Sequence, residues 1–239
     1  MGFTGINNVV FVHIPKTAGT SLRKTLERNL KGRVHLFDYG PNQRLTSDAV
    51  RRFRYPETIG IKDESVNIRS LIEFWRRNER SKVSVCDLAK AGKKVFLMGH
   101  FEAHQYTSLF EPSSFVTFIR KPVDRVVSEY KHFVRNLGFE GSLKEFCAAP
   151  YQRNKQSRYL DGLDLDSIGF IGRVENFEVD LRQLEHVLGI KLDLKRDNVA
   201  PSNQSVEVDK STLDLIKNLN TDDLRLYDRV CNLCSKISA

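Results

Sequence analysis

Residues 9–22, VVFVHIPKTAGTSL, constrain the fold most, because they join a buried strand to a helix through one short loop. The apolar run at 8–13 is typical of a strand buried on both faces of a parallel sheet. Leucines then recur at helical spacing from Leu22 onward, and Thr20 or Ser21 is placed to cap that helix. Such a strand–loop–helix unit points the free N–H groups of the helix N-terminus at one spot, which favours a phosphate or a sulfate.

The residue types in this loop suit an anion. Lys16 can reach it from the strand side, Gly19 lets the backbone approach closely, and Pro15 stiffens the start of the loop. The lysine precedes the glycine, whereas it follows the glycine in the triphosphate-binding pattern G-x-x-x-x-G-K-[ST]. Threonine and serine hydroxyls add hydrogen-bond donors. The candidate binding residues are Pro15, Lys16, Thr17, Ala18, Gly19, Thr20 and Ser21.

A second segment, residues 115–130 (FVTFIRKPVDRVVSEY), repeats the order of strand, turn and helix. Arg120 lies at the strand end, and Ser128 lies two turns into the helix. An arginine fork and a serine hydroxyl can together hold a second phosphate. The helical spacing also predicts that Arg125 and Ser128 face away from the core, opposite a face rich in valine.

The remaining apolar runs predict an α/β fold with three layers, in which a central, mostly parallel sheet carries helices on both faces. No repeat or linker divides the chain, so we expect one domain over residues 1–239. The stretch 38–92 is the least regular and is rich in arginine. It is either a solvated surface with a small hydrophobic patch or an insertion that faces the substrate. Further strands are predicted at 33–37, 95–99, 115–119 and 168–174, and helices at 122–135, at 176–188 and twice within 211–236.

The composition narrows the partners. The chain has 38 Lys and Arg against 30 Asp and Glu, a formal net charge of +8, which favours an anionic partner. No run approaches the roughly 20 apolar residues of a membrane span, and no secretory signal precedes the first strand, so a cytoplasmic protein is expected. Cys231 and Cys234 have the spacing of half a zinc site, but no second pair completes it. We therefore predict two small buried side chains there and no metal site.

With both segments in view, the sequence resembles the sulfotransferases that use PAPS (3′-phosphoadenosine 5′-phosphosulfate), in particular the branch with the carbohydrate 2-O-sulfotransferases. Residues 13–21 (HIPKTAGTS) match the family pattern His-x-Pro-Lys-[Thr/Ser]-[Ala/Gly]-Gly-Thr-Ser. The second pattern, Arg-x-Pro-x-x-Arg-x-x-Ser-x-Tyr, is met from Arg120 to Tyr130. Weaker similarities lie at 154–160, 171–181 and 198–205.

The resemblance implies a fold like that of the P-loop proteins and a sulfuryl transfer from PAPS to a hydroxyl or amine, which leaves 3′-phosphoadenosine 5′-phosphate (PAP). The acceptor would be a carbohydrate or a small metabolite, with no metal and no nucleic acid involved. The resemblance also implies that the first loop holds the 5′-phosphosulfate and that Arg120 and Ser128 hold the 3′-phosphate. Lys16 would stabilise the charge that develops on the leaving phosphate.

The acceptor hydroxyl must lose its proton, and His100 is the best-placed base. It follows the apolar run 95–99, at a strand end of the kind where ligands gather in open α/β sheets, and an imidazole suits a base at neutral pH. The carbohydrate branch of the family has a catalytic histidine at a similar strand end, which agrees with this choice. His104 and Glu102 are the alternatives, and His13 is expected to orient the loop.

Two other functions stay open from the sequence. A P-loop kinase or nucleoside triphosphatase would use the same strand, loop and helix, although the lysine is displaced and a clear strand-end carboxylate for magnesium is missing near the loop. A non-catalytic binder of acidic glycan or nucleic acid would use the arginine-rich segment, with a steep salt dependence and no need for a nucleotide. Binding of PAP without magnesium distinguishes both from a sulfotransferase.

Overall fold

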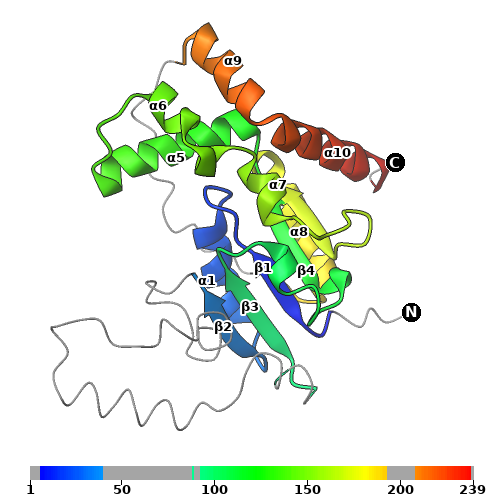
Figure 1. The fold of residues 1–239 in the computed structure, drawn as a ribbon. Coiled ribbons are helices and arrows are strands. Elements are labelled where there is room, and N and C mark those ends of the chain that lie inside the picture. The colour runs from blue at the N-terminus through cyan, green and yellow to red at the C-terminus, as the bar shows by residue number, and fades with distance from the viewer. Residues whose placement is uncertain (1–5, 40–87, 89–91, 193–207, 238–239) are drawn as a thin grey trace, which may run out of the picture.

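The predicted strands form one parallel sheet. The computed structural model describes residues 6–39, 88, 92–192 and 208–237. Within these residues the strand order is β2-β3-β1-β4-β5, and every neighbouring pair is parallel (Figure 1). All five predicted strands are confirmed, and no strand end moves by more than about two residues. The strands are β1 (Val9–Val12), β2 (Val34–Asp38), β3 (Val95–Gly99), β4 (Phe115–Ile119) and β5 (Phe170–Arg173).

One face of the sheet is covered by α1 (Gly19–Asn29) and α8 (Phe177–Leu188). Val9 and Phe11 of the central strand point to this side and are fully buried against the leucines of the two helices. Leu22 and the two leucines that follow at helical spacing all lie in this layer, as their period predicts.

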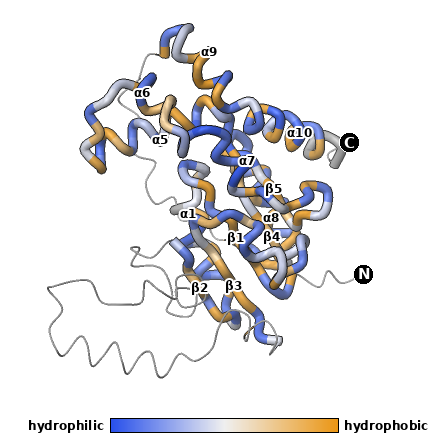
Figure 2. Tube along the Cα trace, viewed as in Figure 1, coloured by the Kyte–Doolittle hydropathy of each residue, from blue (hydrophilic) through white to orange (hydrophobic). Residues whose placement is uncertain are grey.

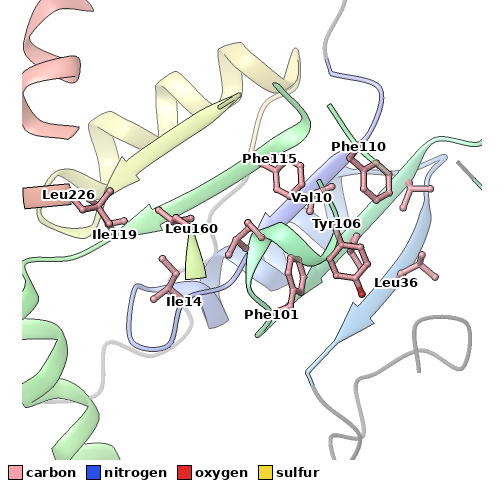
Figure 3. Close-up of a cluster of buried hydrophobic side chains, with 14 of the residues drawn as sticks. Val10, Ile14, Leu36, Phe101, Tyr106, Phe110, Phe115, Ile119, Leu160 and Leu226 are labelled. Carbon is pink, nitrogen blue, oxygen red and sulfur yellow. The ribbon is translucent and has the colours of Figure 1, made fainter. Parts of the chain in front are cut away.

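The opposite face is covered by α7 (Lys155–Tyr159) and α10 (Thr221–Ile237), together with short 3-10 turns. Val10 and Val12 point to this side, because successive residues of a strand face opposite ways. Figure 3 shows the side chains that fill the layer, including Leu226 of α10. The predicted three-layer α/β architecture is therefore confirmed.

A third apolar cluster lies beyond the sheet, at the end from which α1 and α5 leave (Figure 1). It joins α5 (Pro122–Leu137), α6 (Leu143–Ala148) and α9 (Lys210–Leu219) around buried side chains such as Val126 and Phe146. In Figure 2 apolar colour dominates the strands, whereas the outer helices carry both apolar and hydrophilic colour. These helices add a wall next to the carboxyl ends of the strands.

Parts of the earlier predictions fall outside the described residues. The structure does not describe residues 40–87 and 89–91 of the irregular stretch 38–92, which include Cys86. It also does not describe the block at 198–205. No helix in the part of the chain that the structure describes is long and apolar enough to cross a membrane.

Candidate active site

Three neighbouring strands each lead directly into a residue of the candidate site. His100 follows β3, His13 follows β1, and Arg120 follows β4. The carboxyl ends of parallel strands meet at one edge of the sheet, where ligands of open α/β sheets bind. The backbone N–H of His13 donates to the Gly99 carbonyl at 2.9 Å, which locks two of these strand ends together. The structure thus brings the first loop, the proposed base and the second anion motif to one place.

The first loop, residues 13–18, is held in an uncommon backbone conformation. Lys16 and Ala18 both have positive φ angles, of 71° and 61°. Non-glycine residues in this region cost about 1–3 kcal/mol each and cluster at ligand-binding sites. The Thr17 hydroxyl is buried and donates to the Ile14 carbonyl at 2.9 Å, which braces the turn from inside. Thr17 can therefore offer an anion its backbone N–H, while its hydroxyl is already engaged.

The helix that follows the loop begins earlier than the sequence predicts. Its first residue is Gly19 and its N-cap is Ala18, so Thr20 and Ser21 lie within the first turn and are not caps. The side chains of Thr20 and Ser21 are outside the described part of the structure. An alanine at the N-cap has no side-chain oxygen to satisfy the first N–H groups, which favours an anion there.

Gly19 is required by the close approach of His13. A Cβ atom on Gly19 would lie 1.8 Å from Nε2 of the His13 ring, so any larger residue would displace the histidine. The His13 ring is itself buried, and its Nδ1 lies 3.0 Å from the Tyr39 hydroxyl. Burial lowers the pKa of His13 well below its usual value, with His100 adding to the effect. A neutral His13 therefore packs against the start of α1.

The Lys16 ammonium lies among charges that α5 and the end of β4 contribute. Burial lowers the pKa of Lys16, the Glu129 carboxylate raises it, and Arg120 and Arg135 lower it again. The half-buried Lys16 ammonium therefore has two further cations, Arg120 and Arg135, acting on it. Such a surplus of positive charge is stabilised when an anion with several oxygens binds.

Arg120 connects the second anion motif to the first loop. Its Nη1 donates to the Lys16 carbonyl at 3.4 Å, although the two residues are 104 positions apart. Ser128 is half-buried on α5, which starts at Pro122 as predicted. The two candidate anion sites are thus next to each other and joined by a hydrogen bond.

His100 has the tautomer that a general base needs. Its Nδ1 lies 2.5 Å from the His13 carbonyl oxygen, which can only accept, so Nδ1 carries the proton and Nε2 keeps its lone pair. Burial lowers the pKa of His100, while the hydrogen bond to His13 raises it. The ring also lies 4.3 Å from the His13 ring, centroid to centroid. His100 is therefore neutral at pH 7, and its ring is oriented by the His13 carbonyl and by packing on the His13 ring.

The sequence matches the sulfotransferase family over residues 3–165, about two thirds of the chain. The chain belongs to the sulfotransferase family. Among solved structures, the protein is similar to a sulfotransferase from Alicyclobacillus acidocaldarius, with 18% identity and a TM-score of 0.47 over 91% of this chain and 93% of that one. It is also similar to mouse sulfotransferase SULT7A1 complexed with PAP, with 11% identity and a TM-score of 0.42 over 93% and 68% of the two chains. No curated protein matches it in sequence.

The alternative bases of this sulfotransferase-family protein are more exposed than His100. The His104 side chain is 46% exposed, and its Nδ1 lies 3.7 Å from carboxylate oxygens of both Glu102 and Asp161. His100, in contrast, is held by a hydrogen bond to the His13 carbonyl and packs on the His13 ring, which makes it the better candidate.

A carboxylate does lie at the end of one strand, but not next to the first loop. Asp38 closes β2 and is fully buried, with its Oδ2 accepting a hydrogen bond from the Tyr106 hydroxyl at 2.9 Å. Its carbonyl accepts from the His100 backbone N–H at 2.8 Å. Asp38 thereby supports the strand end that carries His100, and β3 separates it from the first loop. The sequence reading placed residue 38 in the irregular segment, one position beyond the predicted strand.

Arg125 of this family member is not on the solvent side of α5, as the helical spacing predicts, but is fully buried. Its guanidinium pairs with Glu129 one turn later, and the other carboxylate oxygen of Glu129 accepts from the Lys155 ammonium at 2.7 Å. All three side chains are less than a tenth exposed. The turn at 150–152 and Lys155 of α7 cover the face that an isolated helix would expose, and Arg125 Nη2 donates to the Gln152 carbonyl at 3.3 Å.

The sequence indicates only the helical pair of this cluster, not the lysine that completes it. Arg125 and Glu129 have the i, i+4 spacing of a helical ion pair, whereas Lys155 comes from a short helix 26 residues further on. The Glu129 carboxylate also raises the pKa of Lys16 and of His100. A buried anion therefore acts electrostatically on both candidate catalytic groups.

Replacing Glu129 is expected to destabilise the protein strongly. Glu129→Leu leaves two buried cations without their shared carboxylate, which costs about 3–5 kcal/mol in comparable sites. For a chain of this size that corresponds to a fall in Tm of about 6–20 °C, measured by circular dichroism. The matched control is Arg229→Ala, which breaks an exposed pair with Asp166 and should change the stability by less than about 1 kcal/mol. A Glu129 variant with the Tm of the control would show that the cluster does not stabilise the fold.

Proposed function

We propose that the protein transfers a sulfuryl group from PAPS to a hydroxyl group, with His100 as the base. The observation that supports this most is the arrangement at the strand ends. A histidine with a free Nε2, a strained lysine-containing loop and an arginine follow three adjacent strands of one sheet. Family membership supplies the reaction type, and this arrangement supplies residues with suitable chemistry for each role.

The first loop and Arg120 suit the two phosphate-bearing ends of such a nucleotide. The N-terminus of α1 and the Lys16 ammonium would hold the 5′-phosphosulfate, and Arg120 with Ser128 would hold the 3′-phosphate. The fit rests on the surplus of cations around Lys16, since the nearby Glu129 carboxylate is already shared by Arg125 and Lys155. An anion that brings its own charge offsets the repulsion among these cations.

The chain's own groups would then act on the transfer. Bound PAPS supplies an activated sulfuryl group whose leaving group is a phosphate. Lys16 and the loop N–H groups are placed to stabilise negative charge on that phosphate. His100 Nε2 would accept the proton of the acceptor hydroxyl, while Nδ1 stays bonded to the His13 carbonyl. The His13 ring, packed on Gly19, would keep base and loop in register.

The acceptor class follows from chemistry rather than from a bound ligand. A hydroxyl group needs a base, and a neutral, buried imidazole provides one at neutral pH. The net charge of +8 is compatible with an acidic carbohydrate acceptor and equally with a small hydroxylated metabolite. We therefore propose a hydroxylated acceptor, with carbohydrates as the first class to screen.

Thermal unfolding with two nucleotides tests this function. PAP at 100 times its Kd should stabilise the protein by about 2.7 kcal/mol, which raises Tm by about 5–10 °C for a chain of this size. ATP with magnesium is the comparison, because a P-loop kinase would require it. A shift with ATP and magnesium but none with PAP would overturn the proposal in favour of a kinase or triphosphatase.

A further inference from the structure

The backbone of Arg120 is held by a side chain from another helix. The Gln156 side-chain amide pairs with the backbone of Arg120, the residue that follows β4. Its Oε1 accepts from the Arg120 N–H at 2.9 Å, and its Nε2 donates to the Arg120 carbonyl at 2.9 Å. Gln156 is fully buried and Arg120 is half-buried, so both bonds are at least partly shielded from water. A buried backbone N–H and carbonyl that lose such partners pay the full cost of desolvation.

Gln156 is in turn held by α10. The Asp223 carboxylate, also fully buried, accepts from the backbone N–H of Gln156 at 3.1 Å and from that of Ser157 at 2.8 Å. It also accepts from the Ser157 hydroxyl at 2.9 Å. Asp223 thus satisfies the first N–H groups of α7, a helix too short to be stable without such contacts.

Further hydrogen bonds join the residue before α7 to the start of α10. Asn154, at a left-handed φ of 44°, accepts through its side-chain oxygen from the backbone N–H of Asp222 at 3.0 Å. Its own N–H donates to the Asn220 side chain at 3.0 Å. Figure 2 shows α7 as a hydrophilic segment beside the sheet, and Figure 3 shows Leu226 of α10 next to Ile119, the residue before Arg120. Polar and apolar contacts therefore fix α10 to the end of β4.

We propose that Gln156 is a positioning residue for Arg120, and that Asp223 of α10 holds Gln156 in place, so that the C-terminal helix sets the affinity for a 3′-phosphate. This inference rests on the proposed function, in which Arg120 binds that phosphate. The matched family region ends at residue 165, so α10 lies outside it.

The physical reason is that the position of the Arg120 backbone determines where its guanidinium lies. The same residue donates through Nη1 to the Lys16 carbonyl, so a rotated Arg120 peptide would move the guanidinium away from both the first loop and the phosphate. A charge-assisted hydrogen bond depends on its geometry, and a misaimed fork loses its bidentate contact. The 5′-phosphate, held by the first loop, would be affected less.

The test compares PAP with adenosine 5′-monophosphate, which lacks only the 3′-phosphate, by isothermal titration calorimetry. Gln156→Met removes both hydrogen bonds at nearly constant volume. It should lower the preference for PAP over the monophosphate about tenfold, the factor expected when one charge-assisted bond is lost. Affinity for the monophosphate should stay within about twofold. Gln156→Glu, which keeps the acceptor and loses the donor, should fall between wild type and Gln156→Met.

The matched control is Gln152→Met. Gln152 is also buried, four residues earlier in the chain, and its side-chain amide has no hydrogen-bond partner among the described residues. This variant should keep the wild-type preference for PAP. Asp223→Asn, which weakens the cap of α7 without touching Arg120, should lower the preference in the same direction as Gln156→Glu.

The outcomes separate the two proposals. A wild-type protein with no preference for PAP over the monophosphate would refute the role of Arg120 and with it the proposed function at this site. A wild-type preference that survives in Gln156→Glu and Asp223→Asn would overturn the positioning role alone. Equal weakening of both nucleotides would also overturn it, because a general loss of structure does not single out the 3′-phosphate. If Gln156→Met fails to fold, the other two variants still decide.

Discussion

Lys16→Ala is expected to lower kcat by about 10²–10³-fold, the loss seen when one preorganised donor to a developing anion is removed. Burial lowers the pKa of the Lys16 ammonium, the Glu129 carboxylate raises it, and Arg120 and Arg135 lower it. That arrangement stabilises charge only when an anion is present, so the lysine should matter far more to the reaction than to the fold. Initial rates with saturating PAPS and a sulfatable acceptor measure the effect.

The control for Lys16 is Lys31→Ala, an exposed lysine just after the end of α1. This variant should retain the wild-type rate. Lys16→Ala should also unfold within a few degrees of wild type, since the side chain is only half-buried and its attraction to Glu129 is opposed by Arg120 and Arg135. An unchanged kcat in a folded Lys16→Ala protein would remove the lysine from the proposed mechanism.

His100→Ala is expected to reduce transfer by about 10²–10⁴-fold while PAP binding stays nearly intact. The imidazole has an unprotonated Nε2 at the strand end, and its hydrogen bond to the first loop goes to the His13 carbonyl, at the start of the loop before Lys16. For wild type, kcat/KM should fall as pH drops below the ordinary histidine value of about 6.5. The limb lies on the acid side of this value because burial lowers the pKa of His100, so the base loses its lone pair only at lower pH.

The control for His100 is His104→Ala, which should transfer at close to the wild-type rate. His104 is nearly half exposed and faces two carboxylates. Loss of transfer in His104→Ala, together with retention of transfer in His100→Ala, would identify His104 and not His100 as the base. Calorimetry with PAP tells a loss of chemistry from a loss of nucleotide binding in both variants.

Three of the five strands were predictable because each is a run of apolar residues buried on both faces, which leaves a strong local signal. The runs at 9–12, 95–99 and 115–119 are buried at every position, so their sequence pattern is continuous rather than alternating. The helices α6 and α7 were not predicted. They have six and five residues, too few for a helical period to show, and capping bonds from Ser142, Glu145 and Asp223 hold them.

The two loops and the base could be proposed from sequence because each carries its residues next to a strong strand signal. The details of their surroundings could not. The burial of Arg125 depends on helices that pack over α5, and the contacts of Glu129 with Lys155 and of Arg120 with Gln156 join positions 26 and 36 residues apart. A helical wheel treats α5 as if it had one solvent face, whereas the fold covers nearly all of its first two turns.

The central place of β1 has a consequence for how the protein is made. Val9 pairs with Phe96 and Val10 pairs with Phe115, so β1 is synthesised before both of the strands that it pairs with. At roughly 5–20 residues per second, Phe96 is added about 4–17 s after Val9. Throughout that interval an apolar strand has no partner on either edge, a state that promotes aggregation. We therefore expect the newly synthesised chain to depend on chaperones until β4 is complete, and its nucleotide site to form late, after the long-range pairs close.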